Sequence, residues 1–286
     1  MLSKEYHADP RMSQSKLKLI LDGVEEFKYA IDNPKKPSDS QNLGSAVHVL
    51  ILEPHRADVI ATVPKFDGNS REGKIFKLMM QGWGPDYFPV TEKKVKKQEK
   101  GRFYEVDSQE KDFIFEMGSK YAKVLTNPKD YLILTEEEHE QAKRMAEAAF
   151  KNDDTRHILS ASRHFEKVHH FNYKDIDFKC QLDTQGHMFI ADLKTTTVKN
   201  NDYEILRAMR KYRYLFQAAC YSNVFGCNSY YILFVRSEPP YAVFPIKLSQ
   251  ERIDEGRFEF DKACDDYNYC LKHNPNFIAN NELREI

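Results

Sequence analysis

The chain has 286 residues, of which 41% are hydrophobic and 13% aromatic, enough to bury a sizeable core. Its 43 Lys and Arg residues nearly balance its 44 Asp and Glu residues, so any basic surface for nucleic acid must be local. Five scattered cysteines without a Cys-x-x-Cys pair disfavour disulfides, a zinc site or an iron–sulfur cluster, and no apolar run reaches the ~18 residues of a membrane span. We therefore expect a soluble cytoplasmic protein without a membrane partner.

The front of the chain is predicted to be mainly helical. Apolar residues at helical spacing predict helices over residues 12–29, 42–52, 104–125, 136–150 and 155–160. Ser13 is a plausible N-cap of the first helix, and Pro54 should end the second. The segment 66–101 is expected to be irregular. It includes most of a basic run from Lys93 to Arg102, for which a solvated loop is the simpler interpretation.

The pattern changes to strands in the back half. Strands are predicted over residues 164–173, 176–182, 188–195, 229–235 and 241–246, and helices over 203–225 and 250–272. The order β-β-β-α-β-β-α predicts an α/β (α+β) fold, in which a small mixed sheet is flanked by helices. We predict a single domain over residues 1–286, with a mainly helical portion at 1–160 and the sheet at 161–286.

Three charged residues stand on two apolar strands joined by a short turn, within the stretch FKCQLDTQGHMFIADLKTTT at residues 178–197. Asp183 precedes the turn, and Asp192 and Lys194 follow it on one strand, where residues two apart share a face. Two close carboxylates favour a hard cation such as Mg²⁺ or Mn²⁺. The lysine could orient or deprotonate a water and stabilise a phosphorane-like transition state. The alternative is a surface hairpin with a salt bridge.

Five other polar residues are candidates for the same site. His48 lies on a buried helix and is either a satisfied core residue or a nitrogen ligand to the metal. Glu53 ends that helix as a cap or as part of an ion pair, and Glu166 is either an acid behind the ligands or an exposed strand residue. Gln217 interrupts an apolar helix face that it shares with Tyr221, which suits hydrogen bonds to a phosphate or to the attacking water.

Candidate DNA contacts come from two basic groups. The first lies on the predicted helix after the Asp192 strand and comprises Arg207, Arg210, Lys211 and Arg213. The second comprises Arg71 and Lys74, in a predicted loop that could close over DNA.

Five segments, taken in order, carry a resemblance to a known family. They are MSQSKLKLIL at 12–21, LGSAVHVLILEP at 43–54, KCQLD at 179–183, IADLKTTT at 190–197 and YRYLFQAACY at 212–221. The sequence resembles the RecE-like (exodeoxyribonuclease VIII type) exonucleases of phages and prophages, in the PD-(D/E)XK nuclease superfamily. One segment departs from the family pattern, because Gln181 and Leu182 stand where Arg-Pro is usual.

The resemblance implies a restriction-endonuclease-like PD-(D/E)XK core with a helical N-terminal elaboration. In such a core, His48, Asp183 and Asp192 hold two Mg²⁺ ions, for which Mn²⁺ can substitute, Lys194 acts on the water, and the Gln217–Tyr221 pair assists. It further implies 5′ to 3′ digestion of one strand of linear duplex DNA to leave 3′ overhangs for recombination. The implied partners are double-stranded DNA ends, other copies of the chain in a homo-oligomeric ring, and a single-strand annealing protein, in a bacterial host cell.

Two other functions stay open at this point. The first is a DNA-binding recombination accessory protein that has the nuclease fold but no turnover. The second is a structure-specific endonuclease of the same superfamily, which would cut a covalently closed circle where an exonuclease would not.

Overall fold

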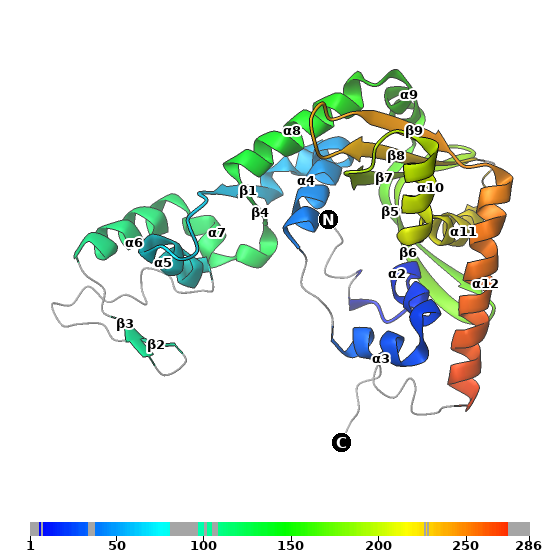
Figure 1. Cartoon of the computed structure of the whole chain (residues 1–286), viewed down its shortest axis with the longest axis horizontal. Helices are drawn as coiled ribbons and strands as arrows, with labels where there is room; N and C mark the ends of the chain where they lie inside the picture. Colours follow the sequence, from blue (N-terminus) through cyan, green and yellow to red (C-terminus); the bar gives the residue numbers. More distant parts are fainter. Residues whose placement is uncertain are drawn as a thin grey trace. The chain divides into compact units, whose positions relative to one another are not determined.

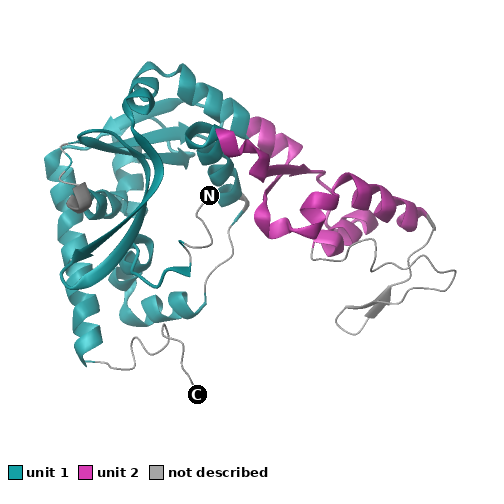
Figure 2. Cartoon of the chain, turned by 180° about the vertical axis from the view of Figure 1, so that it is seen from behind, with its two compact units in different colours: residues 1–54, 142–286 teal, residues 55–141 magenta. Residues whose placement is uncertain are grey.

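A computed structural model describes residues 6, 8–33, 38–80, 97–99, 102–104, 108–225, 227 and 229–273 of the chain. The chain divides into two compact units, one formed by residues 1–54 and 142–286 and the other by residues 55–141 (Figure 2). That residues 1–286 act as a single domain stays a prediction. None of the helices in the described residues has both the length and the apolar character needed to cross a bilayer.

The first unit is built on a five-stranded mixed sheet (Figure 1). In spatial order its strands are β5 (His164–Tyr173), β6 (Ile176–Gln185), β7 (Phe189–Thr196), β8 (Ser229–Arg236) and β9 (Val243–Lys247). β7 and β8 run parallel, and the other neighbouring strands run antiparallel. The five strands predicted from the sequence are confirmed, and with them the small mixed sheet.

The β5–β6 hairpin closes through the predicted Lys174-Asp175 turn. Both residues have positive φ, 48° and 61°, which is the signature of the two-residue type I′ turn that matches the twist of a hairpin. The tip is held against helix α12 (Gln250–His273), because the Lys174 ammonium lies 2.8 Å from the Asp265 carboxylate and the Tyr173 hydroxyl donates to Asp261 at 2.6 Å.

The predicted helix over residues 203–225 is wrong at its centre. It is two helices, α10 (Asp202–Lys211) and α11 (Tyr214–Phe225), separated by Tyr212 and Arg213. Arg213 has φ 56°, a left-handed conformation that ends α10. Its guanidinium donates to Asp22 at 2.7 Å and to the Lys18 carbonyl oxygen at 2.8 Å. The break depends on these partners, which lie far away in the sequence.

The predicted helix over residues 12–29 is also interrupted. Ser13 caps α2 (Gln14–Leu17) as predicted, by accepting from the Lys16 amide at 3.4 Å. The chain then tightens into the 3₁₀ helix η1 (Lys18–Asp22) and continues as α3 (Val24–Asp32). Gly23 separates η1 from α3 with φ 136°, a conformation that side-chain-bearing residues rarely adopt.

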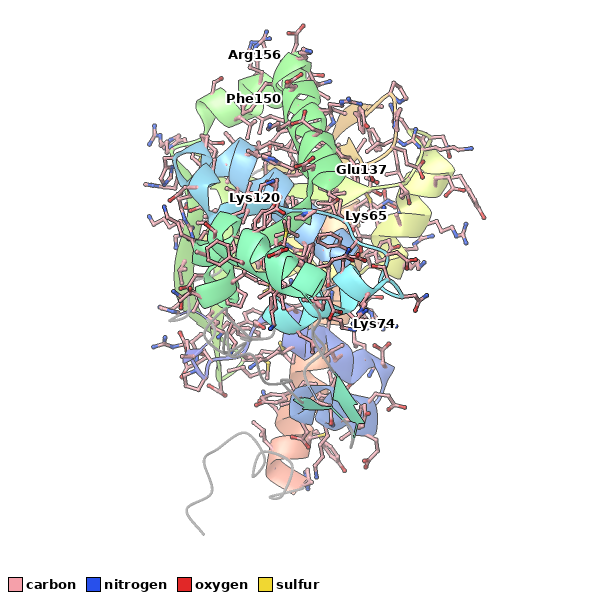
Figure 3. All side chains as sticks on the ribbon, turned by 90° about the vertical axis from the view of Figure 1, so that its left-hand side faces the viewer. Lys65, Lys74, Lys120, Glu137, Phe150 and Arg156 are labelled. Atoms are coloured by element: carbon pink, nitrogen blue, oxygen red, sulfur yellow. The ribbon has the colours of Figure 1, made fainter. Side chains whose placement is uncertain are left out.

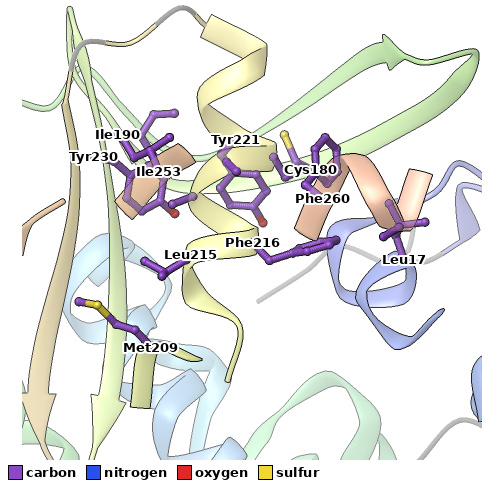
Figure 4. Packing of buried hydrophobic residues seen from close by; sticks show 14 of the residues in the cluster. Leu17, Cys180, Ile190, Met209, Leu215, Phe216, Tyr221, Tyr230, Ile253 and Phe260 are labelled. Carbon is purple, nitrogen blue, oxygen red and sulfur yellow. The ribbon is translucent and has the colours of Figure 1, made fainter. Parts of the chain in front are cut away.

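Helices α11 and α12 pack together over the main hydrophobic core of the first unit (Figure 4). Phe216, Tyr230 and Phe260 are among its fully buried side chains. Gly256 lies where the two helices cross, since a Cβ at this position would overlap the Leu215 carbonyl oxygen. This core supports the inner strands from which the site residues project.

Helix α4 (Asp39–Leu52) is the buried helix predicted over residues 42–52. It begins three residues earlier than expected, because Ser38 and Gln41 form a capping box. Ala46, Val47 and Val49 are fully buried. The helix packs against β7 and ends before Pro54, as predicted.

The second unit contains more regular structure than the sequence indicated. It includes the 3₁₀ helices η2 (Pro54–Val59) and η4 (Pro128–Asp130), the parallel pair β1 (Ile60–Val63) and β4 (Leu132–Thr135), the antiparallel pair β2 (Lys97–Glu99) and β3 (Arg102–Tyr104), and helices α5 (Arg71–Met80), α6 (Ser108–Lys120) and α7 (Ala122–Thr126). The expectation of irregular structure over 66–101 is therefore wrong for α5 and β2. Phe66 and Phe76 hold α5 in an aromatic cluster with ring centroids 5.1 Å apart.

At the end of this unit, the Lys65 ammonium lies 3.5 Å from the Glu137 carboxylate (Figure 3). Glu137 belongs to α8 (Glu136–Lys151), which is followed by α9 (Asp153–Ala161). Both helices were predicted from the sequence. The basic run from Lys93 to Arg102 falls largely outside the described residues, so its proposed role stays a prediction.

Candidate active site

The two predicted acids lie where strands β6 and β7 separate. Paired residues of this ladder are Gln185 with Ile190 and Thr184 with Ala191. Asp183 and Asp192 come directly after the Thr184–Ala191 pair. Beyond this pair, the Leu193 amide of β7 donates to the Asp183 carboxylate at 2.7 Å. A side chain of β6 thus accepts the hydrogen bond that a backbone carbonyl would accept in a continued ladder. The acids thus occupy the place where the sheet opens.

His48, Glu166 and Asp183 form a cluster whose ligand atoms all lie within 4.8 Å of one another. The His48 Nδ1 atom is 3.7 Å from a carboxylate oxygen of each acid. The three side chains are only partly exposed, at 25%, 12% and 14%, respectively. The structure therefore brings together one imidazole and two carboxylates from residues far apart in the sequence.

His48 reaches this cluster because α4 approaches β7 closely. Gly44 lies one helical turn before His48, and a Cβ there would stand only 2.9 Å from the Thr195 hydroxyl oxygen. The second nitrogen of His48, Nε2, is 2.9 Å from the Leu193 carbonyl oxygen. If it donates to that carbonyl, Nδ1 is left as the atom that faces the acids. The core interpretation of His48 accounts for its burial but not for the two acids beside it.

Glu166 belongs to the cluster itself, which the sequence did not indicate. Its φ of 49° is unusual for a non-glycine residue within a strand. Its carboxylate accepts a hydrogen bond from the Gln181 amide at 2.5 Å. Gln181 is one of the two residues that depart from the family's Arg-Pro pattern, and here it orients an acid of the site. The other, Leu182, is fully buried in the core.

Asp192 is held by two other side chains. The Lys194 ammonium lies 2.6 Å from one carboxylate oxygen, and the Gln217 amide donates to the other at 2.5 Å. Asp192 is 3% exposed, so this pair is largely shielded from water. Among the described residues, the cluster that could share one ion consists of His48, Glu166 and Asp183. Asp192 is not in that cluster, so its role as a metal ligand stays a prediction.

The electrostatics of these groups follow from burial and proximity. Burial raises the pKa of Asp192 to about 6. The Lys194 cation opposes this rise, and the Asp183 carboxylate adds to it. Burial also raises the pKa of Asp183, although His48 and Lys194 act against it. Burial lowers the pKa of His48, but the Asp183 and Glu166 carboxylates outweigh it, and the net shift is upward. Carboxylates crowded in this way favour a cation between them.

Lys194 is a fixed cation at this site. Burial lowers the pKa of its ammonium, but Asp192 and Asp183 raise it by more, and the net shift is upward. A lysine whose pKa is raised stays protonated at neutral pH. It can therefore orient a water or stabilise negative charge, whereas the deprotonating role that the sequence left open is disfavoured.

Lys18 is a cation that interacts electrostatically with the site, and the sequence analysis did not name it. Burial first, and then the neighbouring Lys194 and Arg213 cations, lower the pKa of its ammonium, while Asp22 and Asp192 oppose the shift. Lys18 lies in η1, 176 positions before Lys194 by residue number. The segment MSQSKLKLIL contained a signal for this residue, since a lysine within an apolar helical pattern needs a partner.

Tyr221 and Glu53, two further predicted site residues, lie on α11 and at the end of α4. Tyr221 is 6% exposed on α11, and burial raises the pKa of its hydroxyl well above the ordinary value. Glu53 is the C-cap residue of α4, and its backbone amide donates to the Val49 carbonyl at 3.0 Å. Their participation in the reaction stays a prediction.

Most of the predicted DNA-binding arginines already contact acids within their own unit. Arg210 pairs with Glu255 at 2.9 Å, Arg213 with Asp22 at 2.7 Å, and Arg207 with Glu204 at 3.9 Å. Lys211 instead places its ammonium over the Tyr212 ring, 5.1 Å from the centroid. These contacts give Arg213 and Arg210 a structural role that the basic pattern alone did not indicate.

In the second unit, the predicted loop residues Arg71 and Lys74 lie on helix α5, so their placement in a loop is wrong. Arg71 forms an ion pair and a hydrogen bond with Glu110, the latter at 2.9 Å. Lys74 is exposed. Contact of either residue with DNA stays a prediction.

The donor set of the cluster fits a divalent cation. Ligands on opposite sides of one Mg²⁺ are about 4 Å apart, close to the 4.8 Å that bounds the cluster. Carboxylates suit Mg²⁺ and Mn²⁺, and an imidazole is accepted by Mn²⁺ and other transition metals. Small side-chain movements would therefore allow His48, Glu166 and Asp183 to share one ion.

Comparisons with known proteins identify a family for this chain. Residues 101–277 match the family model described as a PDDEXK-like domain of unknown function (DUF3799). No curated protein matches the chain. A crystal structure described as a "putative exonuclease" from Eubacterium rectale aligns over 96% of this chain and 93% of its own, with 13% identity and a TM-score of 0.44. Because the family match spans more than half of the chain and contains Asp183, Asp192 and Lys194, the chain belongs to this PDDEXK-like family, and with it to the PD-(D/E)XK nuclease superfamily.

Proposed function

We propose that this nuclease is a divalent-metal-dependent exodeoxyribonuclease. It hydrolyses one strand of linear double-stranded DNA from its end, in the 5′ to 3′ direction, and leaves 3′ single-stranded overhangs. The observation that carries the proposal is the cluster of His48, Glu166 and Asp183 within 4.8 Å, beside the buried Asp192–Lys194 pair. The duplex substrate and the polarity are supported by the RecE-like motifs of the sequence.

The side chains divide into two functional groups. His48, Glu166 and Asp183 would hold Mg²⁺ or Mn²⁺, with Asp192 as a ligand to a second ion. When bound, such ions polarise the scissile phosphate and lower the pKa of a coordinated water. Lys194, kept protonated by its acids, donates hydrogen bonds to the attacking water or to the phosphate oxygens and stabilises the charge that develops there.

Two further residues support this arrangement. Gln217 donates to Asp192 and so holds its carboxylate in one orientation. The Lys194 and Arg213 cations lower the pKa of the Lys18 ammonium, and we propose that this ammonium contacts a phosphate of the DNA. A half-buried cation crowded by other cations gains most when an anion arrives, because the ligand relieves the repulsion.

End-labelled linear duplexes test the proposal directly. With Mg²⁺, a label at the 5′ end should be released as a nucleotide before a label at the 3′ end, and a chelator should abolish both. The Lys194→Ala variant should bind the duplex without digesting it. Release from the 3′ end first would refute the polarity, and cleavage of a covalently closed circle would identify an endonuclease. Binding without any release by the wild-type protein would identify an accessory protein.

The assembly and the cellular context are also part of the proposal. We propose a homo-oligomeric ring around the DNA, a single-strand annealing protein as partner in recombination, and action in the cytoplasm of a phage's bacterial host. The RecE-like motifs support each of these. Light scattering of the purified protein tests the ring, since a monomeric mass at working concentration would contradict it.

A further inference from the structure

Two tyrosines form a stack beside the proposed catalytic lysine. The Tyr214 ring centroid lies 5.4 Å from the Lys194 ammonium. Tyr212 stacks on Tyr214 with centroids 5.6 Å apart and an interplanar angle of 28°. Tyr214 therefore lies between the Lys194 ammonium and the Tyr212 ring in a chain of direct contacts. The two tyrosines lie at the junction of α10 and α11.

The two rings differ in their surroundings. Tyr214 is half-buried and packs against Phe234, with centroids 6.0 Å apart. Tyr212 is 47% exposed, which is unusual for a large aromatic side chain held against another ring. The Lys211 ammonium lies 5.1 Å from the Tyr212 centroid. An exposed aromatic ring and a cation are therefore offered together, next to the site.

The backbone between the tyrosines is fixed in a costly conformation. Arg213 has φ 56°, and it is held there by hydrogen bonds to Asp22 at 2.7 Å and to the Lys18 carbonyl at 2.8 Å. A straight continuation of the helix would place residues 212 and 214 on different faces. The anchored turn instead brings their rings together. Strained, well-anchored turns of this kind occur at functional sites.

We propose that the Tyr212 ring is a stacking platform for the base of the nucleotide next to the scissile phosphate, an inference that rests on the proposed nuclease function. Every base presents a π-face to an aromatic ring, so the contact tolerates any sequence. The Lys211 ammonium meets the phosphate attached to the stacked base. Since a paired base is covered by its neighbours in the duplex, the site takes the terminal nucleotide with its base unstacked from the helix.

The decisive experiment removes either the ring or the base. Steady-state digestion is measured on a linear duplex whose terminal nucleotide, on the digested strand, carries adenine or is abasic. For the wild-type protein, the abasic end should raise KM about tenfold, the factor expected for one base–aromatic stack. Tyr212→Ala should raise KM on the adenine end by the same factor at unchanged kcat. The KM of Tyr212→Ala should be the same on the abasic end as on the adenine end. Tyr212→Trp should restore the wild-type KM on both ends.

Controls separate stacking from structural damage. Tyr269→Ala removes another exposed tyrosine, on α12, and should leave KM unchanged. The proposal would be overturned if the abasic end raised the KM of Tyr212→Ala as much as it raises that of the wild-type protein. A fall in kcat of Tyr212→Ala without a change in KM would also overturn it. Failure of Tyr212→Trp to restore KM would also overturn it.

Fluorescence distinguishes failure of this inference from failure of the nuclease assignment. Terminal 2-aminopurine on the duplex, titrated with wild-type protein in chelator, requires no hydrolysis. A change in fluorescence that Tyr212→Ala abolishes would support the platform even in a protein that does not digest DNA. The same change in both proteins would refute it.

Discussion

Replacing Lys194 with methionine should expose how strongly this site depends on its internal cation. The Lys194 ammonium lies 2.6 Å from the Asp192 carboxylate, and the two side chains are 21% and 4% exposed. Methionine keeps the apolar stem of the lysine but removes its charge. Asp192 would then be a buried carboxylate that retains the hydrogen bond from Gln217 but has lost its charged partner.

The expected cost depends on pH. Breaking a buried ion pair from one side costs about 3–5 kcal/mol, and we expect about 3 kcal/mol at pH 8, because Lys194 is one-fifth exposed. For a chain of this size that is a fall in Tm of roughly 6–12 °C. Burial raises the pKa of Asp192 to about 6 even with the lysine present. Without the lysine this pKa rises further, so Asp192 is protonated at pH 5 and most of the loss should disappear.

Thermal unfolding in chelator at pH 5 and pH 8 measures this difference. Lys199→Met, the same change at an exposed lysine, should leave Tm unchanged at both values of pH. Digestion of linear duplex by Lys194→Met should fall at least about a hundredfold, because a charge-stabilising donor is lost. Equal losses of Tm at pH 5 and pH 8, or full digestion by the variant, would refute the reasoning.

Four further outcomes follow from the site. Because the pKa of Asp192 is raised to about 6, digestion should increase between pH 5 and pH 7 as this carboxyl ionises, and a titration of initial rates will show it. For the same reason, thermal unfolding of the apo protein should show a loss of stability as pH rises from about 4, the ordinary pKa of Asp, to about 6, where the buried carboxyl becomes charged. Gly44→Val should force α4 away from the Thr195 hydroxyl, which lies 2.9 Å from a Cβ at this position, and weaken Mn²⁺ binding about tenfold or more by calorimetry. Glu166→Ala should weaken Mn²⁺ binding by a similar or greater factor, since it deletes an acid of the cluster.

Matched changes elsewhere serve as controls. Gly68→Val adds the same side chain where a Cβ would meet nothing within 4 Å, and it should leave metal binding unchanged. Glu251→Ala removes an exposed acid from α12 and should also be neutral. A rate that does not vary between pH 5 and pH 7, or undiminished metal affinity in Gly44→Val or Glu166→Ala, would contradict the respective prediction.

Local patterns were sufficient for the five-stranded sheet in the back half of the chain. The alternation of apolar residues predicted all five strands of the mixed sheet, and Lys174-Asp175 predicted the turn between the first two. These features depend on neighbours within a few residues, which the sequence displays directly. The same patterns failed for the helices at 12–29 and 203–225, because the apolar period continues through both breaks.

The site was predictable only in part. Asp183, Asp192 and Lys194 stand out from sequence because charge on an apolar strand is rare. Glu166 does not, since the pattern of β5 leaves it among exposed and half-buried polar residues. Its place in the cluster results from its left-handed φ and from the Gln181 amide that holds it.

By itself, the sequence determined the secondary structure of the sheet, the order of the motifs and the identity of the acids and lysine where strands β6 and β7 separate. Only the tertiary structure decided which groups meet there. The close approach of α4 at Gly44 carries His48 to Leu193, and the turn at Arg213 stacks Tyr212 on Tyr214. Both depend on contacts between residues far apart in the chain, α4 with β7 and Arg213 with Asp22, whose free energy comes from packing and burial that no local pattern contains.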